Sequence, residues 1–200
     1  MPSDSPSGNT LLKQKVQEGQ AIQLAIEPDQ AWAGSMLAAD LLTQLYAEAG
    51  YAQLAVIPFA QADTASPPDL ILFGHGSGVF PAQMHAEAAD LKEKVTDLQA
   101  AYPQSGLGLI SAITGDPHEP EWLDIKTLID AQAAYANKLG LMFVHVWQEI
   151  YWRKIAGETW ANYTRSKKDY VLADEGHRLV AECIMDELHR QVGLPAPAGW

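Results

Sequence analysis

Short apolar runs of strand length alternate with longer stretches of helical periodicity along most of this chain. The most apolar run, residues 69–73 (DLILF), is followed at once by a glycine-rich stretch, residues 74–78 (GHGSG). An uninterrupted apolar run bounded by turn residues is typical of a strand that is buried on both faces. Runs of this kind predict five strands, over residues 21–26, 54–59, 69–73, 107–113 and 141–146.

Between these runs, apolar residues recur three and four positions apart, which is the spacing of one helix face. The pattern predicts helices near residues 37–45, 86–102, 121–139 and 179–188. Helices that alternate with strands connect a parallel sheet and cover both of its faces. The expected fold is a three-layer α/β/α domain with a five-stranded parallel sheet in the flavodoxin-like order 2-1-3-4-5, which binds ligands at the carboxyl ends of its strands.

The length and composition suit one globular domain. Of the 200 residues, 48% are apolar and 19% are charged, an ordinary balance for a chain that buries a core. We expect a disordered tail over residues 1–10, a single domain over residues 11–194 and a C-terminal tail over residues 195–200. No apolar run approaches the ~20 residues that cross a bilayer, and the polar N-terminus lacks the pattern of a signal peptide. We therefore expect a protein that is not bound to a membrane and is either cytoplasmic or delivered without a signal peptide.

Charge and cysteine content exclude several classes of function. The formal net charge is −12, from 25 acidic and 13 basic residues, so a phosphate backbone is repelled and nucleic acid is not an expected partner. Cys183 is the only cysteine, which excludes an internal disulfide and a cysteine zinc cluster. His75, His118 and His145 fall at predicted strand ends beside acidic residues, but their spacing matches no known metal site. We expect neither a metal nor a cofactor.

Four stretches resemble conserved blocks of the SGNH/GDSL hydrolases. Residues 68–77 (PDLILFGHGS) resemble the strand and turn of the third block, and residues 29–34 (DQAWAG) resemble the first block. Residues 129–150 resemble the penultimate helix and fifth strand, and residues 173–184 (ADEGHRLVAECI) resemble the last block. The resemblance covers about residues 12–190 and implies the fold and the ester hydrolysis of that family.

The chemistry of that family needs a serine nucleophile, a histidine base with an aspartate three residues before it, and oxyanion donors that include an asparagine. In this sequence the matching positions hold Gln30 for the serine, Gly76 for the asparagine, Lys168 for the aspartate and Val171 for the histidine. Sliding the first block by one residue places Asp29 at the nucleophile, which is still no serine. Because loss of a nucleophile or base lowers the rate by several orders of magnitude, the resemblance implies a hydrolase fold that has lost hydrolysis.

An active esterase with relocated catalytic residues is the alternative. Asp174 and His177 form an Asp-x-x-His pair, although Asp174 also suits the N-cap of the last helix. A third hypothesis is an enzyme that uses Asp29 or Glu27 with His75 or His145 in other chemistry. The GHGSG stretch itself fits three descriptions: an oxyanion motif, a nest of backbone amides that binds an anion, or a plain turn after a buried strand.

Aromatic and basic residues share the segment 151–168. Its aromatic residues are Tyr151, Trp152, Trp160 and Tyr163, and it also carries five of the thirteen basic residues. Such a mixture suits a sugar, an anionic ligand or a protein partner, and the alternative is a long loop whose aromatic rings fold back over the sheet edge. The leading hypothesis is a binding or structural module for a glycan or a protein partner. Its candidate ligand contacts are Trp32, Gly74, His75, Ser77, Trp152 and Trp160.

Overall fold

A computed structural model describes residues 8–27, 37–51, 53–77, 84–113, 122–164 and 171–195. Five parallel strands form one sheet in the order β2-β1-β3-β4-β5. The strands are β1 (Ile22–Glu27), β2 (Leu54–Pro58), β3 (Leu70–Gly74), β4 (Gly106–Ile110) and β5 (Met142–Val144). The predicted fold class and strand order are confirmed.

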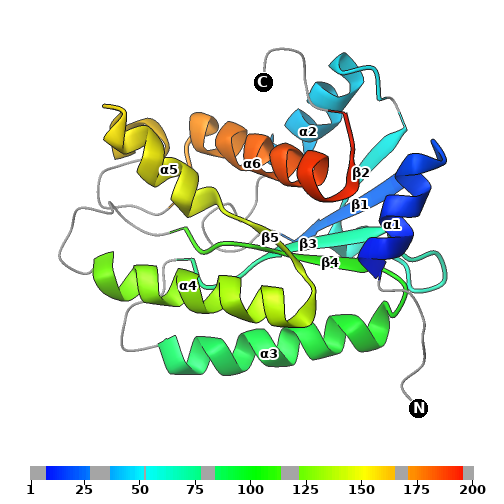
Figure 1. Ribbon diagram of the computed structural model, residues 1–200, viewed down its shortest axis with the longest axis horizontal. Coiled ribbons are helices and arrows are strands. Elements are labelled where there is room, and N and C mark those ends of the chain that lie inside the picture. The colour runs from blue at the N-terminus through cyan, green and yellow to red at the C-terminus, as the bar shows by residue number, and fades with distance from the viewer. Residues whose placement is uncertain are drawn as a thin grey trace.

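Helices cover both faces of this sheet, as Figure 1 shows. The helices α3 (Met84–Ala101) and α4 (Trp122–Leu139) cover one face, and α2 (Leu37–Glu48) and α6 (Asp174–Val192) cover the other. The chain also forms α1 (Gly8–Gln17), α5 (Val146–Ile155) and two short 3₁₀ turns, η1 (Phe59–Gln61) and η3 (Trp160–Asn162).

The central strand β3 explains why two cores form. All five of its residues are buried, and successive side chains of a strand point to opposite faces. Leu70 and Leu72 pack into the cluster beneath α2 and α6, whereas Ile71 and Phe73 pack into the cluster beneath α3 and α4. The continuous apolar run DLILF is therefore what a strand covered on both faces requires.

Two segments differ from the prediction. The tail expected over residues 1–10 ends sooner, because α1 begins at Gly8 and is anchored by the buried side chain of Leu12. The long loop expected over residues 151–168 is partly helical, because α5 continues to Ile155 and buries Ile150. In the described part of the chain, the helices are too short or too polar to span a membrane.

The fourth strand is shorter than predicted. It ends at Ile110, and the backbone of residues 111–113 leaves the regular ladder. The amide of Ala112 donates to the side chain of Gln132 (3.1 Å), and the amide of Ile113 donates to the hydroxyl of Ser77 (2.8 Å). At Ala112 and Ile113, side chains from distant segments thus replace strand partners, and this buried part of the chain leaves the sheet.

Candidate functional site

The carboxyl ends of β1 and β3 lie side by side. Glu27 ends β1 and is the register neighbour of Phe73. The ammonium of Lys94, from α3, lies 3.1 Å from the Glu27 carboxylate and 5.2 Å from the centroid of the Phe73 ring. This contact ties α3 to the last residue of β1. The first-block residues Asp29, Gln30 and Trp32 follow directly and lie outside the described residues.

A buried glutamine on α4 holds the turn after β3 by a hydrogen bond. Gly76 has φ +82°, a left-handed conformation that favours glycine. Gln132, from α4, is 2% exposed, and its amide nitrogen donates to the carbonyl oxygen of His75 (2.9 Å). A Cβ atom at Gly76 would lie 3.3 Å from that same amide nitrogen. The position matching the family's asparagine therefore has no side chain, and Gln132 occupies the space beside it.

Two serines near the strand ends have structural partners. Ser77 is 3% exposed and its hydroxyl accepts from the amide of Ile113. Ser111 is also buried, and its hydroxyl accepts from the amide of Trp147 (3.1 Å). Both hydroxyls hold loops at the ends of β3 and β4. Of the predicted ligand contacts here, Ser77 and Gly74 are thus buried, and His75 is partly exposed.

The start of α6 has a register fixed by packing. A Cβ atom at Gly176 would collide with the carbonyl oxygen of Tyr163, which accepts from the amide of Ala173 (2.9 Å). The packing at the start of α6 therefore favours glycine at position 176. Lys168, the matching acid position, lies outside the described residues.

The Asp174–His177 pair occupies the first turn of α6. The N-cap residue is Ala173, which makes no side-chain capping bond, so the prediction that Asp174 caps the helix is wrong. Asp174 is instead the first helical residue, where its charge is favourable because of the helix dipole. The side chain of His177 is 6% exposed, which suits a buried packing position better than a base that meets dissolved substrate.

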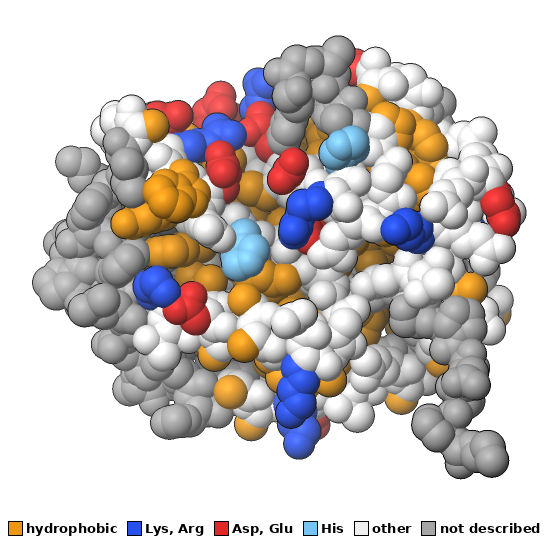
Figure 2. Space-filling view, viewed as in Figure 1, with side chains coloured by type: hydrophobic (Ala, Val, Ile, Leu, Met, Phe, Trp, Pro, Cys, Tyr) orange, Lys and Arg blue, Asp and Glu red, His pale blue; other side chains and the backbone are white. Residues whose placement is uncertain are grey.

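Apart from the strand ends, a hollow lies between α5 and α6, beside the edge strand β5. We call it the α5–α6 groove, and its volume is about 440 Å³. It is lined by His145, Gln148, Glu149, Trp152, Arg153, Glu182, Cys183, Asp186 and Glu187. Figure 2 shows acidic and basic side chains close together over α5 and α6. The volume lies within the range of small-molecule sites, ~300–1,000 Å³.

Acidic side chains dominate the lining of the groove. Its only cation, Arg153, donates to Glu149 on the same helix (3.0 Å) and to Glu182 on α6 (2.9 Å). Arg190 also donates to the buried carboxylate of Glu187. Its Nη2 atom lies 2.5 Å from one carboxylate oxygen and 2.7 Å from the other. The basic character expected of this region from its sequence is therefore neutralised at Arg153, and an anionic ligand is disfavoured.

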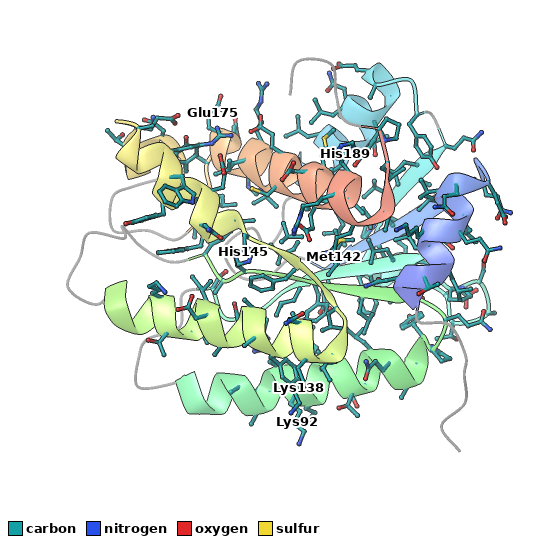
Figure 3. The ribbon with its side chains drawn as sticks, in the orientation of Figure 1. Lys92, Lys138, Met142, His145, Glu175 and His189 are labelled. Atoms are coloured by element: carbon teal, nitrogen blue, oxygen red, sulfur yellow. The ribbon has the colours of Figure 1, made fainter. Side chains whose placement is uncertain are left out.

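His145 stands at the junction of β5 and α5, as Figure 3 shows. Its ring packs edge-on against Phe143, with centroids 4.4 Å apart, and within the described residues its buried Nδ1 has no hydrogen-bond partner. Burial lowers the pKa of His145, which favours the neutral imidazole. Burial raises the pKa of the Cys183 thiol, so this cysteine stays protonated and is no nucleophile.

The predicted site residues thus fall into three places. Gly74, His75 and Gly76 lie at the end of β3, Val171 lies shortly before α6, and Trp152 lines the α5–α6 groove; the side chain of Trp160 lies outside the described residues. Gln148 and Asp186, which line the α5–α6 groove, are not among the candidates named from the sequence. Polar residues at helical spacing in the two segments could have indicated them. Within the described residues, no three histidine, cysteine or acidic side chains gather closely enough to hold a metal ion.

Comparison with known proteins gives structural matches only. No protein-family model matches the sequence, and no curated protein is similar to it in sequence. The acetylxylan esterase Axe2 from Geobacillus stearothermophilus matches with a TM-score of 0.64 at 15% identity, over 85% of this chain and 95% of that chain. A protein described as a GDSL-like lipase from Parabacteroides merdae matches with a TM-score of 0.61 at 12% identity, over 88% and 97%.

A third match is LAE5, an alpha/beta hydrolase from the metagenome of Lake Arreo, with a TM-score of 0.59 at 14% identity, over 88% of this chain and 98% of that chain. Two further Axe2 structures are catalytic mutants in which a serine or an aspartate is replaced by alanine. These neighbours confirm that this chain has the SGNH/GDSL hydrolase fold that the sequence resemblance implied. At these identities the likeness concerns the fold alone.

Proposed function

We propose that this protein keeps the SGNH/GDSL fold without ester hydrolysis and binds a glycan. The observation that carries the proposal is the pair Gly76 and Val171. Gly76 stands where the family has an oxyanion donor and offers no side chain, while its left-handed turn is held by Gln132. In the register set by the sequence resemblance of residues 173–184, Val171 stands where the family has its base. A valine cannot move a proton, and a glycine has no side-chain amide to stabilise an oxyanion as an asparagine does.

A binding function accounts for the exposed side chain of Trp152 beside the α5–α6 groove. In the described residues, two large hydrophobic residues are exposed, Leu139 and Trp152. Trp152 is the more exposed of the two, at 54%. A large exposed aromatic side chain beside a hollow marks a contact site more often than a packing position. The hollow beside it is polar, so its ligand carries hydrogen-bonding groups as well as apolar surface.

The charges favour a glycan over an anionic ligand. The chain has a net charge of −12, and the hollow beside Trp152 is lined by four carboxylates against one guanidinium. Like charges repel phosphate, sulfate and polyuronate. A saccharide, whose hydroxyl groups both donate and accept hydrogen bonds, meets no such barrier.

The proposal is tested by calorimetric titration with xylohexaose, cellohexaose and mannohexaose, followed by mass spectrometry of each mixture. We expect saturable heat with at least one of these sugars. We also expect an acetylated xylo-oligosaccharide to keep its acetyl groups after prolonged incubation. Acetate release above a matched albumin control would overturn the non-hydrolytic part of the proposal, and absence of binding to every sugar would overturn the binding part.

One observation favours a second candidate, an active esterase. The structural neighbours are hydrolases, and Axe2 is an acetylxylan esterase. Ser35 directly follows the first-block segment, and the last helix carries His177. An esterase of this kind would need these or other residues to replace the family's positions, and its activity would disappear on mutation of the histidine.

A further inference from the structure

The facing sides of α5 and α6 are polar although the two helices are neighbours. On α5 the groove is lined by residues 148, 149, 152 and 153, and on α6 by residues 182, 183, 186 and 187. Both sets have the spacing i, i+1, i+4, i+5, which belongs to one face of a helix. Helices that pack tightly place apolar residues on such a face. Two polar stripes therefore leave an open groove where an interface would otherwise form.

Ion pairs hold the two walls of the groove in place. Arg153 bridges them, because it donates to Glu149 on α5 and to Glu182 on α6. At the other end, Glu187 is held by Arg190 within α6. These charged groups already have partners, so they fix the width of the groove instead of offering unsatisfied hydrogen-bonding groups to a ligand.

Two other polar side chains in the groove are available to a ligand. Within the described residues, Gln148 and Asp186 make no hydrogen bond or ion pair. His145 also lines the groove, but its Nδ1 atom is buried and has no hydrogen-bond partner in the described residues. The carboxylate of Asp186 accepts only, the amide of Gln148 donates and accepts, and His145 can meet a ligand only through its other ring nitrogen, Nε2. This mixture suits a ligand with several hydroxyl groups.

Three aromatic side chains of α5, Trp147, Tyr151 and Trp152, contact one another in succession. Trp147 is buried and stacks on Tyr151, with ring centroids 5.6 Å apart and an interplanar angle of 11°. Tyr151 contacts Trp152 edge-on, with centroids 5.5 Å apart. The exposed indole of Trp152 thus contacts the ring of Tyr151, which is itself held by stacking on the buried Trp147. A supported aromatic ring binds with little loss of conformational entropy.

We propose that the α5–α6 groove is the carbohydrate site and that it takes a neutral saccharide. The inference rests on the proposed function and adds the place and the ligand class. The Trp152 ring stacks on the apolar face of one sugar ring, and Asp186, Gln148 and His145 hydrogen-bond to its hydroxyl groups. Neither Gly76 nor Val171 lines this site, because in the described part of the chain the groove is lined by His145 and by residues of α5 and α6.

The chemistry of the groove selects against other glycans. The carboxylate of Asp186, which has no ion pair in the described residues, and the net charge of −12 repel a polyuronate. The other three carboxylates of the groove are neutralised by arginines, which removes most of the attraction for an amino sugar. A neutral sugar makes the same hydrogen bonds and brings no charge to desolvate.

The test uses calorimetric titration of the full chain with neutral hexamers (xylohexaose, cellohexaose, mannohexaose), a glucosamine hexamer and a galacturonic acid hexamer. The variants are Trp152→Ala, Trp152→Phe and Asp186→Asn. The matched controls are Leu139→Ala and Asp130→Asn, which remove an exposed apolar side chain and an exposed carboxylate on α4. Near-ultraviolet circular dichroism checks that each variant is folded.

We expect Trp152→Ala to weaken binding of a neutral hexamer about tenfold or more, since about 1.4 kcal/mol corresponds to tenfold and aromatic anchors exceed that value. Trp152→Phe should retain part of the affinity, Asp186→Asn should lose several-fold, and both controls should bind like the unmodified protein. The galacturonic acid hexamer should not bind.

Binding that is unaffected by both Trp152→Ala and Asp186→Asn would place the sugar elsewhere and overturn this inference while the proposed function stands. Binding of the glucosamine hexamer alone would overturn the neutral class but keep the glycan function. Absence of binding to every sugar would overturn both. If Trp152→Ala does not fold, Trp152→Phe and Asp186→Asn decide the same question.

Discussion

Gln132 ties α4 to the turn that follows β3, because its side-chain amide donates a 2.9 Å hydrogen bond to the carbonyl oxygen of His75. The oxygen of the same amide accepts from the backbone of Ala112, at 3.1 Å. One buried side chain thus fixes the loops that leave two neighbouring strands. The strand-end region owes its shape to this amide more than to its glycines.

Replacement of Gln132 should therefore destabilise the whole fold. In Gln132→Leu the carbonyl of His75 and the amide of Ala112 lose a buried partner, and each unsatisfied group costs ~1–3 kcal/mol. We expect the free energy of unfolding to fall by about 2–4 kcal/mol in urea titration. The control is Gln44→Leu, whose exposed side chain bonds only to Glu48 on the same helix and should change stability by less than about 0.5 kcal/mol. Equal effects would show that the bridge is unimportant.

The turn at Gly76 should tolerate asparagine better than alanine. A left-handed φ costs most L-residues ~1–2 kcal/mol, and asparagine adopts it more readily. We expect Gly76→Ala to lower stability more than Gly19→Ala, because Gly19 has φ +66° but no atom within 4 Å of an added Cβ. Gly76→Asn should lie between Gly76→Ala and the unmodified protein in thermal unfolding. If alanine and asparagine behave alike at Gly76, backbone conformation does not decide what that position accepts.

Much of the fold follows from the sequence because its signals are local. The run 69–73 becomes β3 almost residue for residue, and the helical spacing of residues 37–45 becomes α2, which continues to Glu48. The helix α1 was missed because its apolar positions are few, and it is stabilised by the burial of Leu12 against distant parts of the chain. The segment of α5 was taken for a loop because aromatic, acidic and basic residues are interleaved there.

The sites depend on contacts that sequence spacing does not reveal. The bridge from Gln132 to His75 spans 57 residues, and the ion pair from Arg153 to Glu182 spans 29. Nothing local to Asp174 shows that Ala173 takes the cap position in its place. The proposal that Gly76 and Val171 replace catalytic residues rests on the sequence alone, because the family resemblance sets their alignment. The α5–α6 groove becomes visible only when the two helices are brought together.

Gly176 should not accept a side chain. In Gly176→Ala the new Cβ atom meets the backbone carbonyl of Tyr163 and the side chain of Leu172, so the start of α6 must move. Overpacking of this kind costs ~1–3 kcal/mol, which we expect to see as a lower midpoint in urea. Glu175→Ala, an exposed neighbour on the same turn, should change stability by less than about 0.5 kcal/mol. A stable Gly176→Ala protein would mean that the register of the last block is not fixed by packing.

Stability should fall in mild acid partly because of His145. Burial lowers the pKa of His145, although the nearby carboxylates of Glu187 and Asp130 oppose the shift and Arg190 supports it. The unfolded chain then binds a proton more readily than the folded one as the pH falls below about 6.5, so the folded state loses stability. In His145→Gln this part of the loss should disappear, which urea titrations at about pH 7.5 and about pH 5.5 would reveal. Identical pH dependence in both proteins would contradict the shift.

The most direct test of a hydrolase fold without hydrolysis is turnover of p-nitrophenyl acetate by the purified protein, measured against albumin at matched concentration. With no serine at Gln30 and no base at Val171, we predict a rate that rises linearly with substrate and equals that of the albumin control. Saturable turnover well above that control, abolished by His177→Ala or Ser35→Ala, would contradict the account and establish an esterase with relocated catalytic residues.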